Sequence, residues 1–156
     1  MRKQIIGVDS PGTLDDGGPW LDLEPIARVE ISSEAPDYPI EAALSGGSGG
    51  WRAGGPGPQT IRLCFDMPRP IRRIKLVFVE QAHPRTQEFA LRWRVAGGES
   101  YQDILRQQFT FSPPGTSEER EEYRVDLAGV AAIELRIIPD VSGGQAPATL
   151  SMLRLA

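Results

Sequence analysis

Trp51 and Arg52 stand side by side in a glycine- and proline-rich segment, residues 45–58, and this pair suits sugar recognition. An aromatic face can cover the apolar C–H patch of a pyranose, and a guanidinium can donate to two neighbouring hydroxyl groups. Long loops often carry binding residues. In the competing interpretation, Trp51 closes the end of a hydrophobic core and Arg52 packs along it. Because large aromatic side chains are mostly buried, the sequence favours this second interpretation for Trp51.

His83 is the only histidine, and it lies with Pro84 between two expected strands, at a predicted hairpin tip. A loop position favours function only weakly. The simpler interpretation is a solvated turn in which His83 has no role, and the sequence favours it.

Arg92 and Arg94 share the exposed face of a strongly patterned strand, and Arg62 or Arg73 can join them from neighbouring strands. Such a face suits an acidic glycan or a carboxylate-rich protein. Arginines on a strand face more often pair with acids on adjacent strands and keep the sheet soluble, so we expect the latter. The acidic run 118–122 is expected to be a solvated loop.

Residues for catalysis are sparse. No nucleophile-elbow sequence is present, and Cys64 lies in mid-strand without a basic partner that the sequence implies. Carboxylates for glycoside hydrolysis need a defined separation, and Asp37 with Glu41 is only a loose candidate. One histidine and one cysteine give no zinc spacing. We therefore expect a protein that is not an enzyme and that has no cofactor and no metal site.

Composition limits the partners and the compartment. The chain has 156 residues and a formal net charge of -4, without a basic stripe, which argues against nucleic-acid binding. No segment reaches the roughly 20 apolar residues of a membrane span, and the N-terminus lacks the apolar stretch of a signal peptide. A single cysteine excludes an intramolecular disulfide framework. We expect a cytoplasmic protein.

Short alternating segments fill the chain from residue 27 onward, and the 14 prolines and 17 glycines fall mostly between them. In 87–95, Phe89, Leu91 and Trp93 occupy one face, which is the pattern of a half-buried strand. The expected strands are 27–33, 59–66, 71–80, 87–95, 101–111 with a break near Leu105, 121–127, 132–139 and 148–155. This pattern predicts an all-β fold, an antiparallel two-sheet sandwich or jelly roll. Residues 1–19 are expected to form a flexible arm, and residues 20–156 a single domain.

Several segments, in their order along the chain, resemble the discoidin family, also called the coagulation factor V/VIII type C domain. These segments are Val29–Glu34, Ile40–Leu44, Gly50–Ala53, Gln59–Leu63, Glu88–Trp93, Tyr101–Ile104 and Ala148–Leu155. The resemblance covers roughly residues 20–156 and implies a galactose-binding-like jelly roll whose loops at one end bind glycans, phospholipid head groups or proteins. In galactose-binding relatives a loop histidine and arginine contact sugar hydroxyls, and His83 with Arg85 resembles that pair.

The chain departs from the family pattern where relatives hold a structural calcium ion. The loop before Trp51 lacks a carboxylate, and Met152 stands where a late acid is expected. Calcium requires charged oxygen ligands, so we expect no bound calcium. The paired cysteines of secreted relatives are also missing, which agrees with a reducing compartment.

These observations predict a non-catalytic binding module, most simply for carbohydrate. The expected ligand-binding residues are Trp51, Arg52, His83 and Arg85, with the 112–122 loop as a further contributor. The alternative is an intracellular protein-interaction domain that uses a sheet face or an edge strand on the same scaffold. Membrane docking through loop tips is a third option, weakened because the 45–58 loop offers only Trp51 as a large apolar residue.

Overall fold

The computed structural model describes residues 19–45 and 49–156, so the predicted N-terminal arm lies almost wholly outside the described residues. The regular secondary structure of the described residues is nearly all strand, which confirms the all-β prediction. Its elements are β2 (Ala27–Ile31), α1 (Ile40–Leu44), β3 (Trp51–Arg52), β4 (Gln59–Val79), β5 (Arg85–Val95), β6 (Gln102–Phe111), β7 (Glu118–Ile138), β8 (Thr149–Leu150) and β9 (Met152–Leu155). No helix in the described ranges is long and apolar enough to cross a bilayer.

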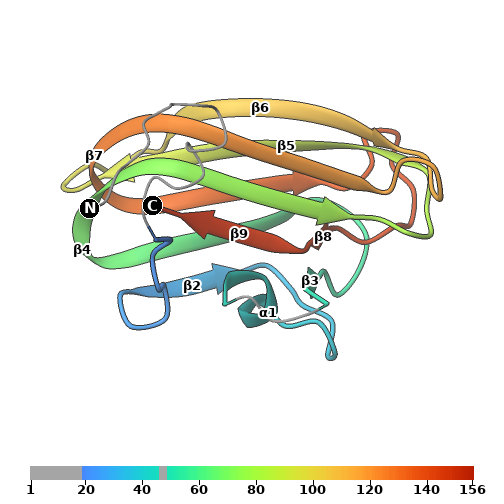
Figure 1. The fold of residues 1–156 in the computed structure, drawn as a ribbon, viewed down its shortest axis with the longest axis horizontal. Coiled ribbons are helices and arrows are strands. Elements are labelled where there is room, and N and C mark those ends of the chain that lie inside the picture. Colours follow the sequence, from blue (N-terminus) through green and yellow to red (C-terminus); the bar gives the residue numbers. More distant parts are fainter. Residues whose placement is uncertain (1–18, 46–48) are drawn as a thin grey trace, which may run out of the picture.

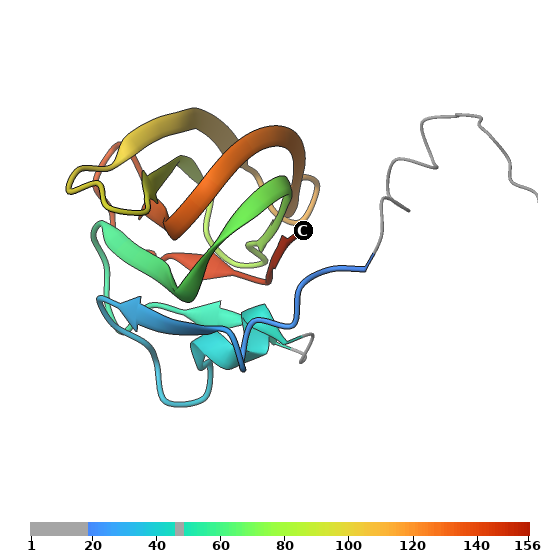
Figure 2. The ribbon, with the colours of Figure 1, turned by 90° about the vertical axis from the view of Figure 1, so that its left-hand side faces the viewer.

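Six strands form one antiparallel sheet that folds over into two layers (Figures 1 and 2). The strand order is β2-β4-β7-β5-β6, and β9 pairs with the second half of β4. The first half of β4 pairs with β2 and with the end of β7, whereas its second half pairs with the beginning of β7. A separate two-stranded sheet, β3-β8, lies at one end (Figure 1).

The two predicted strands 59–66 and 71–80 are one long strand, β4, with a bend in the middle. The register with β7 shifts between Cys64 and Arg69 and twice more before Arg73. Pro68 and Pro70 lie in this interval and carry no backbone N–H, so the ladder is interrupted there. The bend lets one strand contribute to both layers (Figure 2).

The hydrophobic core lies between the two layers and follows the period-two pattern. Phe89 and Leu91 are fully buried, and Trp93 packs against the core from a partly buried position. The ring of Phe78 in β4 and the ring of Phe89 in β5 lie 5.1 Å apart in a tilted arrangement. This packing supports the face that the sequence assigns to 87–95.

The acidic run 118–122 is not a solvated loop, so that expectation is wrong. Strand β7 begins at Glu118, and the turn before it is closed at Ser112 and Thr116, whose backbone groups exchange hydrogen bonds of 2.8 and 3.0 Å. Alternation along β7 turns Glu119 inward, where it is 1% exposed. Strand β6 is continuous, so the predicted break is absent, but the pairing of β6 with β5 is irregular next to Leu105: Leu91 faces Leu105 and Arg92 faces Asp103, which leaves Ile104 as an extra residue in β6.

Candidate functional site

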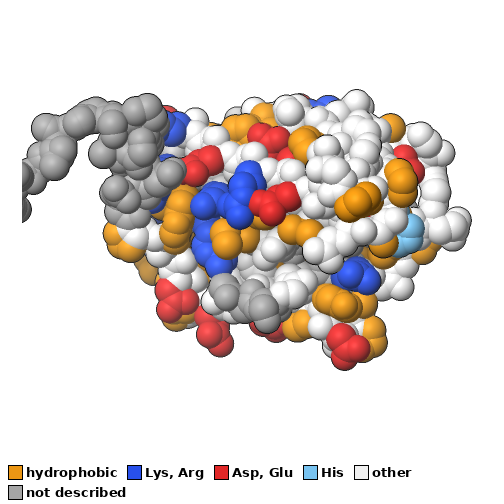
Figure 3. Space-filling model, turned by 45° about the vertical axis from the view of Figure 1, so that its right-hand side comes forward, with side chains coloured by type: hydrophobic (Ala, Val, Ile, Leu, Met, Phe, Trp, Pro, Cys, Tyr) orange, Lys and Arg blue, Asp and Glu red, His pale blue; other side chains and the backbone are white. Residues whose placement is uncertain are grey.

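A depression of about 490 Å³ opens at the loop end of the sandwich and contains three of the four predicted site residues. Trp51 and Arg52 reach it from β3, and His83 reaches it from the β4–β5 loop. Figure 3 shows the histidine, in pale blue, at the surface of this end. Among the described residues, the lining consists of Tyr38, Gly49, Trp51, Arg52, Val79, Glu80, Gln81, Ala82, His83, Pro147, Thr149, Leu150 and Ser151.

Trp51 forms part of the core beneath this depression. Its side chain is 1% exposed, and its indole N–H donates to the carbonyl oxygen of Ser33 at 3.0 Å. Trp51 pairs with Leu150 across β3 and β8. The ring therefore closes the end of the core, as the favoured interpretation holds, while the residue also lines the floor of the depression.

Gly50 brings β3 unusually close to β8. Its φ is +65°, a conformation that side-chain-bearing residues rarely adopt. A Cβ atom at this position would lie 2.6 Å from the carbonyl oxygen of Leu150 and 2.8 Å from the Cα of Ser151. The glycine before Trp51 thus permits the close approach that sets the floor of the depression.

Arg52 points outward, because successive residues of a strand face opposite sides. Its guanidinium carbon lies 4.3 Å from the centre of the Tyr38 ring, in a cation–π contact. The expectation that Arg52 packs along Trp51 is therefore wrong. The backbone N–H of Arg52 also donates to the carbonyl of Tyr38 at 3.2 Å, which joins β3 to the segment before α1.

The His83 loop is held by Glu80, a residue that the sequence reasoning missed. One carboxylate oxygen of Glu80 accepts hydrogen bonds from the backbone N–H groups of Ala82 and His83, each at 3.0 Å. The imidazole Nδ1 of His83 lies 3.4 Å from the same oxygen, and its side chain is 56% exposed. Burial acts to raise the pKa of Glu80, but the hydrogen bonds from Arg85 and these backbone groups outweigh it and hold the pKa below its ordinary value.

Arg85, the fourth predicted residue, lies behind the depression and not in its lining. Its side chain is fully buried, and its Nε donates to Glu80 at 2.7 Å. The remaining donors reach the carbonyl of Pro139 at 2.8 Å and the hydroxyl of Thr149 at 3.2 Å. No part of this side chain is exposed to a ligand, so the pairing of Arg85 with His83 as joint sugar contacts does not fit the structure. Arg85 instead positions the loop through Glu80.

Buried polar groups continue from Arg85 into the interior. Arg85 donates to Gln87 at 3.3 Å, and the amide of Gln87 donates to Glu119 at 3.0 Å. Burial and the neighbouring carboxylate of Glu121 raise the pKa of Glu119 to about 8. A raised pKa favours the neutral acid form of Glu119 at pH 7, and this residue ends a chain of hydrogen bonds that runs from Glu80 through Arg85 and Gln87.

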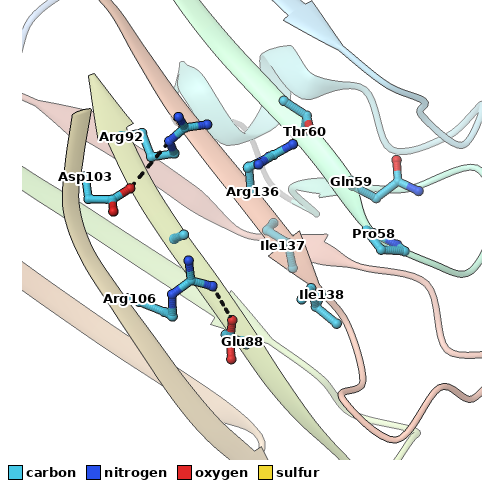
Figure 4. Close-up of a pocket in the computed structure, with 11 residues that line it drawn as sticks. Pro58, Gln59, Thr60, Glu88, Arg92, Asp103, Arg106, Arg136, Ile137 and Ile138 are labelled. Carbon is cyan, nitrogen blue, oxygen red and sulfur yellow. Dashed lines mark hydrogen bonds and ion pairs between the residues drawn. The ribbon is translucent and has the colours of Figure 1, made fainter. Parts of the chain in front are cut away.

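A second, smaller hollow of about 350 Å³ lies on the outer face of the sheet (Figure 4). Its charged walls come from β5, β6 and β7. Arg92 lies 3.5 Å from Asp103, and Arg106 lies 2.6 Å from Glu88. Arg136 projects between β5 and β4, away from these two pairs (Figure 4).

The arginines of this face are arranged in a row of alternating charge. The register places Glu30, Arg62, Glu134, Arg92 and Asp103 opposite one another across five strands. The buried Glu134 accepts from Arg62 at 2.8 Å and from Arg92 at 3.1 Å. The expectation that strand-face arginines pair with cross-strand acids is confirmed for these two. Arg73 does not join them, because it is buried on the second half of β4 and stacks on Trp20.

Potential metal ligands do not cluster in the part of the chain that the structure describes. No group of three or more histidine, cysteine, aspartate or glutamate side chains in that part could hold a metal ion. Cys64 is buried in β4, and desolvation, with the negative charge of Glu30, raises the pKa of its thiol.

Comparison with known proteins identifies the fold but not a family. No model of a protein family matches the chain. A 58-residue stretch is 38% identical to a protein described as "E3 ubiquitin-protein ligase RING1-like" from Arabidopsis thaliana; it covers 35% of this chain and only 18% of the plant protein.

Solved structures resemble the chain along most of its length. The C-terminal domain of a chitobiase from Bacteroides fragilis has a TM-score of 0.63 at 16% identity, covering 88% of this chain and 97% of that one. XRCC1, solved bound to the catalytic domain of DNA polymerase beta, has a TM-score of 0.61 at 15% identity, covering 88% and 98%. A chitosan-binding module from a Paenibacillus chitosanase/glucanase has a TM-score of 0.55 at 12% identity, covering 83% and 94%. At these identities the likeness shows the fold alone: the chain has the galactose-binding-like β-sandwich that also occurs in carbohydrate-binding modules.

Proposed function

We propose that the protein is a non-catalytic carbohydrate-binding module whose ligand occupies the depression at the loop end. The observation that carries the proposal is the convergence of Arg52, His83 and the floor residue Trp51, from two segments far apart in the sequence, in one hollow of about 490 Å³. Concave sites of roughly 300–1,000 Å³ with a few placed polar groups are typical of small-ligand binding. The fold shared with carbohydrate-binding modules supports the same proposal.

The roles in this site follow from exposure. Arg52, His83 and Gln81 are exposed and can reach hydroxyl groups, whereas Trp51 offers only the edge that lines the floor. Glu80 and Arg85 hold the loop that carries His83. Affinity is expected to be modest, since each hydrogen bond to a sugar replaces one to water.

Titration against a glycan panel tests the proposal. Tryptophan fluorescence and backbone NMR shifts should respond to at least one sugar at millimolar concentration or below. Gln81→Ala, which removes an exposed amide at the depression, should weaken that binding severalfold. Gln108→Ala is the matched control, because Gln108 is an exposed amide on β6. If no sugar perturbs either signal, or if both variants behave alike, the proposal is contradicted.

The alternative function is a protein-interaction domain that uses the outer sheet face. It is favoured by the hollow of about 350 Å³ on that face and by β6, which within the described residues pairs only with β5. An unpaired strand edge can accept a strand from a partner. Capture of a stoichiometric protein partner that Arg136→Glu abolishes would favour this alternative over sugar binding.

A further inference from the structure

We infer that the glycan bound in the loop-end depression carries a negatively charged group, a carboxylate or a sulfate, and that Arg52 binds it. This inference rests on the proposed function, because it names the chemical class of ligand for the same site. Three features of the depression support it: Arg52 has no acidic partner among the described residues, its guanidinium is held against Tyr38, and the one carboxylate of the described lining already accepts other hydrogen bonds.

Arg52 is exposed and has no acidic partner among the residues described. No ion pair links its guanidinium to any carboxylate in 19–45 or 49–156, although Asp37 lies next to Tyr38 in the sequence. On the outer sheet face, by contrast, Arg62, Arg92 and Arg106 each contact an acid within 3.1 Å. The chain has more acidic than basic residues, 21 against 17. The positive charge of Arg52 in this depression therefore does not reflect a general excess of basic residues.

Glu80 is the one carboxylate in the described lining, and it does not neutralise Arg52. Its side chain is 7% exposed, and its two oxygens already accept from Arg85, Ala82 and His83. The depression therefore presents the positive charge of Arg52 to a ligand, together with exposed hydrogen-bonding groups of Gln81 and His83. A neutral sugar would leave this charge unmatched.

Stacking on Tyr38 orients the Arg52 guanidinium for an anion. The guanidinium carbon lies over the ring, 4.3 Å from its centre, and among the described residues no hydrogen bond or ion pair uses the N–H groups of this side chain. A planar fork of this kind binds carboxylate or phosphate-like oxygens in pairs, and less conformational freedom is lost when the fork is already held. The backbone bond from Arg52 to Tyr38 fixes the two segments together.

Matched ligand pairs separate this inference from the proposed function. Calorimetric titration would compare a uronic acid glycoside with its methyl ester, and a sulfated galactoside with the unsulfated one. We expect at least one charged member to bind about fivefold or more tightly than its neutral partner. Raising the salt concentration from about 0.05 to 0.5 M should shrink that preference, because salt screens an exposed charge pair.

Two variants identify the residue. Arg52→Gln should remove the preference for the charged member while it leaves weak binding of the neutral member. Arg124→Gln makes the same charge change on the exposed face of β7, outside the depression, and should keep the preference. Circular dichroism melts confirm that both variants fold.

Each outcome decides between the two claims. Equal binding of the charged and the neutral member overturns the inference and leaves the sugar-binding function intact. The inference is also overturned, and the sugar-binding function kept, if Arg52→Gln loses the charged and the neutral ligand together. Failure of every sugar to bind contradicts the proposed function and the inference with it.

Discussion

Arg85 and Glu80 form a buried ion pair behind the candidate site, with the Arg85 Nε 2.7 Å from a Glu80 oxygen. The Arg85 side chain is fully buried, and the carboxylate also receives two backbone N–H groups of the His83 loop. A buried charge that loses its partner is strongly destabilising, whereas an exposed one is not. The pair therefore links the stability of the fold to the shape of the loop that carries His83.

Glu80→Gln should lower the free energy of unfolding by about 3 kcal/mol, because it leaves Arg85 buried without a counter-charge. Urea denaturation at pH 7 measures the loss. Glu30→Gln is the control, since Glu30 pairs with Arg28 and Arg62 at the surface, and it should cost less than about 1 kcal/mol. A cost for Glu80→Gln no larger than that of Glu30→Gln would show that the pair contributes little.

The pH dependence of the same pair has a defined sign. Glu80 has a folded-state pKa below the ordinary value of 4.5, so its contribution is present above that pH and is lost as the pH falls through the folded-state pKa. Below about pH 4.5 the stability of the native protein should therefore fall more steeply than that of Glu80→Gln. Parallel acid-unfolding curves would contradict this assignment.

Glu119→Gln should stabilise the protein at neutral and mildly alkaline pH. Since the pKa of Glu119 rises to about 8 in the folded state, the native chain holds a proton that the unfolded chain releases above about pH 4.5. The free energy of unfolding of the native protein therefore decreases as the pH rises from about 4.5 to 8. The glutamine side chain of the variant does not titrate, so this decrease should be absent from the variant. At pH 7.5 the variant should be more stable by more than about 1 kcal/mol, measured by urea denaturation.

The control for Glu119 is Glu118→Gln, an exposed neighbour that pairs with Arg120 at the surface. Its stability profile between pH 5 and 8 should match that of the native protein. The assignment fails if Glu119→Gln shows the same slope with pH as the native chain.

The sequence predicted the faces of apolar strands well and the direction of polar side chains poorly. Phe89 and Leu91 identify the inward face of β5, and stepping back by two residues along that face leads to Gln87 and Arg85. On β7, Leu127 packs against the core, and Glu119 lies an even number of residues before it, so the two side chains point to the same face of the strand. The alternation of each strand therefore indicates that these polar residues point inward. Their polarity, however, made a loop or a surface position the simpler interpretation.

Other features depend on contacts between distant segments. The sequence predicts two strands where β4 is one bent strand, because the continuity of β4 depends on its pairing with β7 on both sides of the bend. Tyr38 could not be linked to Arg52 from the sequence, because no local pattern predicts that the segment before α1 lies against β3. Residue type and loop position predict Trp51, Arg52 and His83 as binding residues. That they line one depression can be seen only in the folded structure, because the two segments are distant in the sequence.

Trp51→Phe should destabilise the protein by about 2 kcal/mol. The change removes the donor that satisfies the carbonyl of Ser33 and leaves unfilled space in the core. Trp20→Phe is a matched control, since Trp20 is only partly buried and should cost less than about 1 kcal/mol. Equal costs in urea denaturation would show that Trp51 is not an anchor of this end of the core.

Gly50→Ala tests whether the close approach of β3 to β8 shapes the depression. The added Cβ would meet the carbonyl oxygen of Leu150 at 2.6 Å, and the residue would also keep an unfavourable positive φ. Gly57→Ala separates the two effects, because Gly57 has a φ of +94° but no atom within 4 Å of an added Cβ. The Gly57 variant should cost about 1–2 kcal/mol from backbone strain alone.

Gly50→Ala should cost more than the Gly57 variant, by about 1 kcal/mol or more, because β3 must shift away from β8 to relieve the clash. The shift moves Trp51 and Arg52 together, so the affinity for any bound sugar should fall in this variant and not in Gly57→Ala. Urea denaturation and sugar titration on the same samples measure both effects. If the two alanine variants lose equal stability and both keep their sugar affinity, the contact between Gly50 and Leu150 does not set the site.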